Sequence, residues 1–440
     1  MTIVPIGSLI LQAAQGEDPL DMPELCAVLC EQIRGVIERC IEEILEADVD
    51  HWLERKRYER RKRSRRQKVK MRCSRCLSHQ RQNFRRNGHY RRHLNTGWGR
   101  VLLNVPQVKC VCGGNVQLRF RAFRCRQRIW DDLELDVRIE YGRGLSYRQI
   151  KADWDQRLGG SVGLRSLNGR VLATAGEGMP AQPLQKGQVP PVMRVDGIWI
   201  TVMFPTGQVQ KDRLGRTRLV KQAKKVPILA AQGVWPLTGR TVLLAWVRAD
   251  SEDSTSWQKF LEQLYEAGIT PENGLALLVA DGSPGFQVAY QNLYWMVPLQ
   301  RCVFHKLRNV ASAVRIPSNL DRQTARLYRT QFLRQAARIW QAPDATEARL
   351  LYTAFCQQWR ADQPKAIATL ARDFEDTLTF YAVQEQAAAR GQDWPAHLLR
   401  TTSPLERCFR EFRRRYRNAI LFYSEAGARA ATAQLASRFS

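Results

Sequence analysis

Apolar residues recur at helical spacing near the start of the chain. In residues 20–54 they follow one another at intervals of three and four, which places them on one face of a helix. They are Leu25, Val28, Leu29, Ile33, Ile37, Ile41 and Leu45. The pattern therefore predicts a long amphipathic helix. Cys26, Cys30 and Cys40 fall within it and are interpreted as small core residues.

The segments that follow change from strand-like to helix-like periodicity. Short apolar runs at 101–105 and 116–120 predict strands in a cysteine-bearing region at 73–125. Residues 132–178 predict helices, one of them with Ser146 as its N-cap. A glycine turn at 158–161 leads to a second helix near 164–175, which matches a helix-turn-helix pattern. A linker rich in Gly, Pro and Gln ends this part.

Strand and helix signals alternate in the second half of the chain. The predicted strands are 192–204, 225–234, 239–248, 275–281 and 295–302. A helix is predicted at 255–267 and another after Pro284, so we expect a mixed sheet with covering helices. Residues 306–398 carry almost no strand signal and predict several helices. A helix around Glu406 and a short tail close the chain.

Length and charge narrow the class of protein. A chain of 440 residues exceeds one ordinary core, so we expect several domains. The net charge of +27 favours a polyanionic partner, most often nucleic acid. A membrane is the rival partner, but no stretch approaches the roughly 18 apolar residues of a spanning helix. Residues 1–15 lack basic residues, so we expect a cytoplasmic protein whose cysteines are thiols or metal ligands.

Basic side chains gather where phosphate contact is the natural interpretation. Residues 55–72 hold twelve Lys or Arg against a single acid, Glu59, and arginines also crowd the helix of Glu406. Solvated faces are the alternative, but phosphate contacts dominate DNA affinity. The candidate DNA contacts are Arg60, Arg61, Arg63, Arg65, Arg66, Arg85, Arg86, Arg91, Arg148, Arg165, Lys306, Arg308, Arg407, Arg410 and Arg414.

Two cysteine pairs have the spacing of a zinc module. Cys73 and Cys76 form a C-x-x-C pair, and Cys110 and Cys112 form a C-x-C pair followed by two glycines. Tetrahedral Zn²⁺ takes four soft ligands, so we expect a structural zinc-ribbon-like module. The loop at 77–109 is long enough to hold a hairpin of its own. Four unrelated thiols are the alternative, and His79, His89, His93 and Cys125 are weaker substitute ligands.

Three acids stand where a two-metal site would place them. Asp196 lies inside an apolar strand, Asp281 ends another, and Glu406 begins a helix after Ser403-Pro404. Burying a carboxylate in an apolar strand is costly unless something compensates it, and converging acids are usually compensated by divalent cations. Mg²⁺ or Mn²⁺ held by such acids supports in-line cleavage of a phosphodiester. The sequence therefore predicts Mg²⁺-dependent chemistry on DNA.

Each acid also has a structural alternative. Asp196 could cap a turn with Gly197, Asp281-Gly282 is an ordinary turn signal, and Ser403-x-x-Glu406 fits a capping box. Glu411 shares a helix with Glu406 but points about 140° away, so only one of them can face the metals. Further rivals are Asp250, Glu252 and Asp253.

A C-x-x-H pair follows the last predicted strand. Cys302 and His305 are too few ligands for a zinc site. We expect His305 to contact the scissile phosphate or to orient one of the acids, which makes it a candidate catalytic residue.

These residues resemble those of a known family, the IS256-type, Mutator-like transposases, in a variant with an N-terminal zinc module. The resemblance runs from about residue 20 to the end, and its most specific blocks are 301–310 and 401–417. The matching segments are RRNGHY at 85–90, LNTGWGRV at 94–101, VP at 105–106, YGRGLSYR at 141–148, VDG at 195–197, ADG at 280–282, RCVFHKLRNV at 301–310 and TSPLER at 402–407.

The resemblance implies an RNase H-like catalytic domain interrupted by an all-helical insertion. It implies a DDE triad of Asp196, Asp281 and Glu406, binding to terminal inverted repeats, strand cleavage and strand transfer. It also implies a nucleoid-associated protein that acts on double-stranded DNA as a homodimer on paired ends. The expected multidomain α/β organisation is a helical and basic segment at 1–72, the zinc-ribbon-like module at 73–125, the helix-turn-helix region at 126–180, a linker at 181–191, the first part of the catalytic core at 192–310, the insertion at 311–398, and the last core helix with the tail at 399–440.

Two other functions compete with a transposase. A domesticated, catalytically silent DNA-binding regulator would keep the binding modules, although an intact triad argues against it. A nuclease without strand transfer would share the metals but would join no 3′ end to new DNA. The products of the reaction therefore separate these functions.

Overall fold

The computed structural model describes residues 22–59, 72–124, 127–158, 162–173, 178–180, 182–419 and 421–439. The chain divides into two compact units, one formed by Met1–Tyr141 with Leu145–Arg170 and the other by Gly142–Gly144 with Val171–Ser440. The domain boundaries predicted within these units stay predictions. Six of the residues singled out in the sequence lie outside the described part: Arg60, Arg61, Arg63, Arg65, Arg66 and Cys125.

The first unit is built on a long helix against a hairpin. Helix α2 (Met22–Leu53) confirms the predicted amphipathic helix. After the short 3-10 turn η1 (Arg81–Asn83), strands β1 (Phe84–Thr96) and β2 (Gly99–Cys110) form the hairpin expected in the loop between the cysteine pairs. One core joins helix and hairpin through Ile41, Leu45, Leu94, Val101, Leu103, Val105 and Phe123.

Two expectations for this unit are wrong. Residues 116–120 form no strand, because Val116 makes only a single bridge to Cys73. Their alternating apolar residues pack on the core beside the hairpin, so the alternation reports one buried face and not strand pairing. Cys26, Cys30 and Cys40 are exposed and not core residues. They lie off the single stripe of α2 that the hairpin covers.

Three helices complete the first unit. They are α3 (Asp132–Gly142), α4 (Tyr147–Leu158) and α5 (Leu164–Leu172), in the region predicted to be helical. The predicted N-cap of α4 is confirmed: Ser146 Oγ accepts from the Gln149 amide at 3.3 Å. Gln149 Oε1 in turn accepts from the Ser146 amide at 2.8 Å, which makes a reciprocal capping box.

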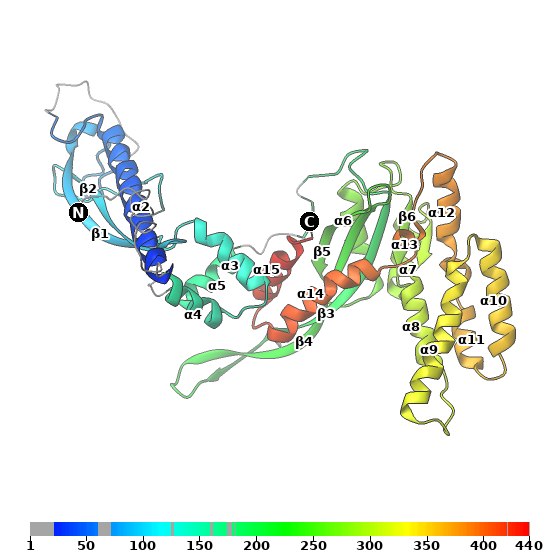
Figure 1. Cartoon of the computed structure of the whole chain (residues 1–440). Helices are drawn as coiled ribbons and strands as arrows, with labels where there is room; N and C mark the ends of the chain where they lie inside the picture. The colour runs from blue at the N-terminus through cyan, green and yellow to red at the C-terminus, as the bar shows by residue number, and fades with distance from the viewer. Residues whose placement is uncertain are drawn as a thin grey trace, which may run out of the picture. The chain divides into compact units, whose positions relative to one another are not determined.

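A mixed five-stranded sheet forms the centre of the second unit (Figure 1). Its strands are β3 (Val192–Lys211), β4 (Thr217–Trp235), β5 (Arg240–Arg248), β6 (Leu277–Ala280) and β7 (Leu299–Arg301). They lie in the order β5-β4-β3-β6-β7, with β3, β4 and β5 antiparallel and β6 and β7 parallel to β3. All five predicted strands are confirmed, although β7 is shorter than expected and β3 and β4 run on beyond the predicted ends.

Helices cover both faces of the sheet. Helices α6 (Ser254–Glu266) and α7 (Pro284–Leu293) pack on the side chains of Met193, Val195 and Leu278, which share one face. The alternate residues Val192, Leu277 and Val279 pack with α8 (Val303–Ala313) and the helices that follow it. These are α9 (Arg322–Arg338), α10 (Ala345–Trp359), α11 (Pro364–Ala371), α12 (Thr379–Ala388) and α13 (Ala396–Leu399), with the 3-10 turns η2 (Ile339–Gln341) and η3 (Glu375–Thr377). They confirm the predicted helical stretch.

The C-terminal part holds one helix more than the sequence predicts. Helix α14 (Ser403–Ala419) carries Glu406, and α15 (Glu425–Ala436) takes the place of the expected tail. Ser424 caps α15 by accepting from the Gly427 amide at 3.1 Å. The buried residues of α15 are mostly alanines, so the contrast between its faces is too weak to stand out in the sequence.

The described helices include none that is both long and apolar enough to cross a membrane.

Candidate functional site

Asp196 is the innermost acid of the site. It lies on β3, the central strand, and is only 9% exposed. Its Oδ1 accepts from the Gly197 amide at 2.8 Å. Burial, together with the charges of Asp281 and Glu406, raises the pKa of Asp196 to about 7, although the charge of His305 and the Gly197 amide act to lower it. A carboxylate in this position needs a nearby positive charge to stay ionised.

His305 and Glu406 converge on Asp196 from two helices. His305 is in the first turn of α8, and its Nε2 lies 2.9 Å from Glu406 Oε1 and 4.0 Å from Asp196 Oδ2. One ligand atom of each residue lies within 4.8 Å of the others. Although burial lowers it, hydrogen bonds with Cys302 and Glu406 raise the pKa of His305 to about 10. The imidazolium therefore bridges two acids that the sequence keeps far apart.

Cys302 ties together the starts of α8 and α14. Its buried Sγ accepts from the Thr402 amide at 3.3 Å, and the Val303 amide donates to the Arg400 carbonyl at 3.0 Å. The Thr402 hydroxyl lies 3.4 Å from His305 Nδ1. Cys302 thus positions the two residues that face Asp196, a role that the C-x-x-H spacing alone does not identify.

Glu406 is used by the site and not by its own helix. Its carboxylate pairs with His305. The Ser403 amide, which a capping box would join to Glu406, donates instead to the Thr401 hydroxyl at 3.1 Å. Although burial raises it, the hydrogen bond from His305 leaves the pKa of Glu406 below its usual value. The capping-box alternative is therefore not what the side chain of Glu406 does here.

Asp281 stands next to this cluster. Within the described residues, the tight group of ligand atoms comprises Asp196, His305 and Glu406 without Asp281. Asp281 follows β6, the parallel neighbour of β3, and its Oδ1 accepts from the Ser283 amide at 2.8 Å. Its charge raises the pKa of both Asp196 and Glu252. A role in the turn and a role in the acidic site are thus compatible for Asp281. One of its carboxylate oxygens holds the turn, and the residue remains beside the other acids.

The rival acids fall into two groups. Glu411 pairs with Arg414 at 2.7 Å, Asp250 with Arg248 at 2.5 Å, and Asp253 caps α6. These contacts explain the three acids without a metal. Glu252 differs, because it accepts from Trp199 Nε1 at 3.0 Å and burial, then the charge of Asp281, raises its pKa. Glu252 therefore belongs to the rim of the acidic site.

Arg194 is a buried cation that sequence reasoning missed. It lies two residues before Asp196 on β3 and is fully buried. Its guanidinium donates to Gln232 Oε1 at 3.1 Å and to the Leu398 carbonyl at 2.6 Å, which anchors the segment leading to α14. Burial lowers the pKa of Arg194 to about 10, so it stays charged at neutral pH. The available signal was the same as for Asp196, a charged residue inside an apolar strand.

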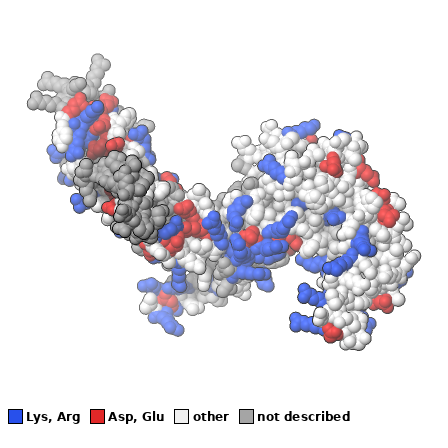
Figure 2. Space-filling model, in the orientation of Figure 1, with Lys and Arg blue, Asp and Glu red and all other residues white. Residues whose placement is uncertain are grey.

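The basic residues near the site differ in accessibility. Lys306, a predicted DNA contact, is buried, and its ammonium donates to the Arg372 carbonyl. Arg308 is exposed and lies 3.9 Å from Glu406. Figure 2 shows Lys and Arg gathered over α14. The exposed cations of this helix are Arg407, Arg410, Arg413, Arg414 and Arg417.

The predicted DNA-contacting residues of the first unit also differ in accessibility. Arg86 forms ion pairs with Glu46 and Asp50 of α2, which fastens the hairpin to the helix. His89 lies 2.6 Å from the same Glu46. The side chains of the other candidates are exposed: Arg85, Arg91, Arg148 and Arg165.

The four predicted zinc ligands form a compact thiol cluster. The Sγ atoms of Cys73 and Cys112 lie 3.4 Å apart, and those of Cys76 and Cys110 lie 3.6 Å apart. Four thiolates around a tetrahedral zinc, each about 2.3 Å from it, stand about 3.8 Å from one another. A Cβ at Gly114 would approach Cys73 Sγ to 2.4 Å, so only glycine fits beside the cluster. The donor set and spacing fit Zn²⁺.

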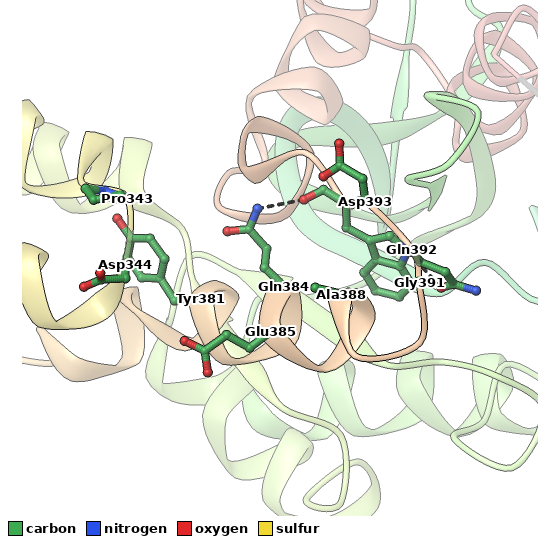
Figure 3. Close-up of a pocket in the computed structure, with 10 residues that line it drawn as sticks. Pro343, Asp344, Tyr381, Gln384, Glu385, Ala388, Gly391, Gln392 and Asp393 are labelled. Atoms are coloured by element: carbon green, nitrogen blue, oxygen red, sulfur yellow. Dashed lines mark hydrogen bonds between the residues drawn. The ribbon is translucent and has the colours of Figure 1, made fainter.

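The helices that follow α8 contain a separate hollow of about 480 Å³ beside α12 (Figure 3). Two of its polar side chains are engaged in the fold: Gln384 donates to the Trp394 carbonyl at 2.7 Å, and Tyr381 donates to the Ala342 carbonyl at 2.8 Å. Asp344, on its rim, caps α10. None of the acidic-site residues lines this hollow.

A mixed sheet that brings two acids and a histidine together from separate elements defines an α/β protein with an enzyme-like site. A family model described as "Transposase, Mutator family" matches residues 20–437. The chain therefore belongs to the Mutator family of transposases.

Three relatives illustrate the similarity. The chain is 29% identical to the transposase for insertion sequence element IS406 of Burkholderia multivorans, over 76% of both chains. It is 25% identical to the transposase for IS905 of Lactococcus lactis, over 77% of this chain and 76% of that one. It is 24% identical to the transposase for IS256 in transposon Tn4001 of Staphylococcus aureus, over 78% of both.

One solved structure gives only a weak likeness. It is the Drosophila P element transposase strand transfer complex, with a TM-score of 0.28 and 10% identity. The match covers 56% of this chain and 59% of that chain, and it is too weak to define the fold.

The buried carboxyl of Asp196 gives a testable dependence of stability on pH. Its folded pKa of about 7 lies above the ordinary value of 3.8, so the folded state loses stability as pH rises from about 4 to about 7. Asp196→Asn removes this loss. Without added Mg²⁺ we expect the variant to exceed wild type in unfolding free energy by up to about 4 kcal/mol above pH 7, with a smaller gap at pH 5. Urea unfolding from pH 5 to 8 measures it.

Asp250→Asn is the matched control. The hydrogen bond and charge of Arg248 lower the pKa of Asp250, so its removal brings no gain with rising pH. A gap between wild type and Asp196→Asn that stays constant from pH 5 to 8 would contradict the prediction.

Proposed function

We propose that this chain is a DNA transposase that binds the terminal inverted repeats of its mobile element and catalyses strand cleavage and strand transfer by a DDE mechanism. The observation that carries the proposal is the convergence of Asp196 and Glu406 beside β6, the strand that Asp281 follows. We also propose that the catalytic core is RNase H-like. The strand order β5-β4-β3-β6-β7, with β3 central, supports this assignment.

Mg²⁺ or Mn²⁺ suits this donor set because the three acids offer hard oxygen ligands. Asp196, Asp281 and Glu406 would hold the ions. When bound, such ions activate the attacking oxygen and stabilise the leaving one. Asp196 fits this role because its carboxyl is buried and its pKa is raised, so a divalent cation would compensate its charge.

His305 and Arg194 act through the acids. His305 holds the Glu406 carboxylate at 2.9 Å and so fixes its direction toward Asp196. Arg194 holds the segment before α14 to the central strand. These contacts hold the carboxylates of Asp196 and Glu406 in fixed positions relative to each other when DNA binds.

The charge distribution supports DNA as the partner. The exposed arginines of α14 begin one residue after Glu406, so they provide a phosphate track beside the acids. Arg85, Arg91, Arg148 and Arg165 offer similar contacts in the first unit. The thiol cluster would hold a structural Zn²⁺ within a zinc-ribbon-like module, which folds that unit and takes no part in cleavage. Assembly as a homodimer on paired ends and association with the nucleoid stay predictions.

A strand-cleavage and joining assay tests the function. The substrate is a duplex that carries the element's terminal repeat, and the reaction contains Mg²⁺ or none. We expect nicks at the repeat end and products joined to target DNA, both only with Mg²⁺. Cleavage without joining would indicate a nuclease, and specific binding without cleavage would indicate a catalytically silent DNA-binding regulator.

A further inference from the structure

Strands β3 and β4 continue well past the sheet as a two-stranded ribbon (Figure 1). We call residues 205–225 the β3–β4 ribbon. Pairing persists to its end, where Lys211 faces Thr217, with a bulge between Pro205 and Val209. The last pairing of β4 with β5 is at Ile228, so the ribbon extends beyond the neighbouring strand. Nearly every residue in it is exposed on both faces.

The ribbon is strongly basic. It carries one acid, Asp212, and seven cations: Lys211, Arg213, Arg216, Arg218, Lys221, Lys224 and Lys225. Asp212 is occupied at the tip, where it accepts from the amides of Leu214 and Arg216 and pairs with Arg218 at 2.8 Å. Its charge is thus neutralised by the ribbon itself, which leaves a surplus of positive charge facing solvent.

The β3–β4 ribbon lacks the packed face that usually stabilises a pair of strands. Two strands without a covered face are only marginally stable in water. The ribbon nevertheless exposes Val209 (63%), Leu214 (73%) and Leu219 (56%). Lysines on an edge strand often have no role beyond preventing aggregation. That explanation does not account for two projecting strands that both carry cations. A partner that covers the ribbon accounts for both features.

The two faces of the ribbon differ in chemistry. Val209 lies opposite Leu219 on one face, whereas Gln210 lies opposite Arg218 on the other. Gln222 and Lys224 share the second face by alternation. Guanidinium and amide groups are the side chains that pair with guanine and adenine edges, and the major groove of B-DNA admits a two-stranded ribbon. This distribution fits DNA better than it fits an acidic protein.

We propose that the β3–β4 ribbon is a DNA-binding arm that enters the major groove of a duplex. Its lysines and arginines contact phosphates on both sides of the groove, and the Gln210–Arg218 face lies toward the base edges. The proposal rests on the proposed function for the presence of DNA, but it adds a contact surface outside the acidic site and outside the predicted helix-turn-helix. The duplex is either the element's end or the target DNA. Measuring the binding of each kind of duplex distinguishes the two.

The test is fluorescence anisotropy of the full chain with two labelled duplexes, one with the terminal repeat and one of unrelated sequence. The ribbon variant is Lys211→Ser, Arg213→Ser and Arg216→Ser, all at exposed positions near the tip. The matched control is Arg360→Ser, Lys365→Ser and Arg390→Ser, which removes the same charge from exposed positions of the helical insertion. Each protein is titrated at several salt concentrations, and its mass is measured in solution.

We expect the ribbon variant to bind at least about tenfold more weakly than the control at physiological salt. Its slope of log K against log salt should fall by about 2.7, because each lost phosphate contact removes about 0.9. A loss on both duplexes assigns the arm to target DNA, and a loss on the terminal duplex alone assigns it to the element's end.

Two results would overturn the proposal. One is a ribbon variant that binds like the control on both duplexes. The other is a lower mass in solution at an unchanged salt slope, which would show that the ribbon contacts a second copy of the chain. If wild type itself binds neither duplex, the proposed function fails with it, so the two failures remain distinguishable.

Discussion

Asp196→Asn and Glu406→Gln are each expected to reduce strand cleavage by about 10³-fold or more while leaving DNA binding within about twofold of wild type. Both changes keep the size of the side chain and remove the negative charge that a divalent cation needs. Asp196 is buried in the central strand, and the carboxylate of Glu406 is held in place by His305. We therefore expect no neighbouring acid to take over the position of either carboxylate. Rates of nicking on a terminal-repeat duplex with Mg²⁺ measure the effect.

Glu411→Gln is the matched control for this experiment. Glu411 is on the same helix as Glu406, but it pairs with Arg414 and Arg438 and not with the site. We expect cleavage by this variant to stay within about twofold of wild type. If Glu411→Gln abolished cleavage and Glu406→Gln did not, the assignment of the third acid would be reversed.

Loss of zinc is expected to unfold the first unit. Binding of a structural zinc contributes about 10–16 kcal/mol in small domains, which is as large as the whole unfolding free energy of an ordinary domain. Cys110 is buried in a second small core, with Val49 and Leu53 of α2 and Phe84 of the hairpin, so its ligand bond and its packing are lost together. We expect one zinc per wild-type chain by elemental analysis. Cys110→Ser should hold none, and its residues before about 170 should become sensitive to protease.

Cys40→Ser separates the loss of the ligand from the loss of a thiol. Cys40 lies on α2 in the same unit, but it is exposed and apart from the cluster. This variant should keep its zinc and its resistance to protease. Wild-type protein without bound zinc, or full zinc content in Cys110→Ser, would refute the zinc assignment.

The predictions from sequence were most accurate where one strong local pattern decided the structure. The apolar runs located all five strands of the sheet, and the helical spacing located α2. Ser146 was identified as an N-cap because the signal spans only four residues. The pattern failed where faces contrast weakly, as in the alanine-rich α15, and where alternation reports packing without pairing, as in residues 116–120.

The composition of the site was predictable, but its contacts were not. Asp196 and Asp281 could be singled out because each is an acid within or at the end of an apolar strand, and His305 because it follows the last strand in a C-x-x-H pair. Glu406 was chosen over Glu411 only through the resemblance to a known family. That His305 sits between Asp196 and Glu406, and that Cys302 holds the start of α14, depends on residues about 100 positions apart. No local pattern carries such a distance.

By itself, the sequence determined the kinds of elements, the ligand types and the excess of positive charge. These follow from side-chain chemistry and from periodicity along a few turns of chain. Only the tertiary structure decided which charges are available. It buried Lys306 and Arg194, engaged Arg86 with two acids of α2, and left the β3–β4 ribbon exposed. The physical reason is that burial and ion pairing are set by segments that meet only when the chain has folded, so identical residues acquire different roles.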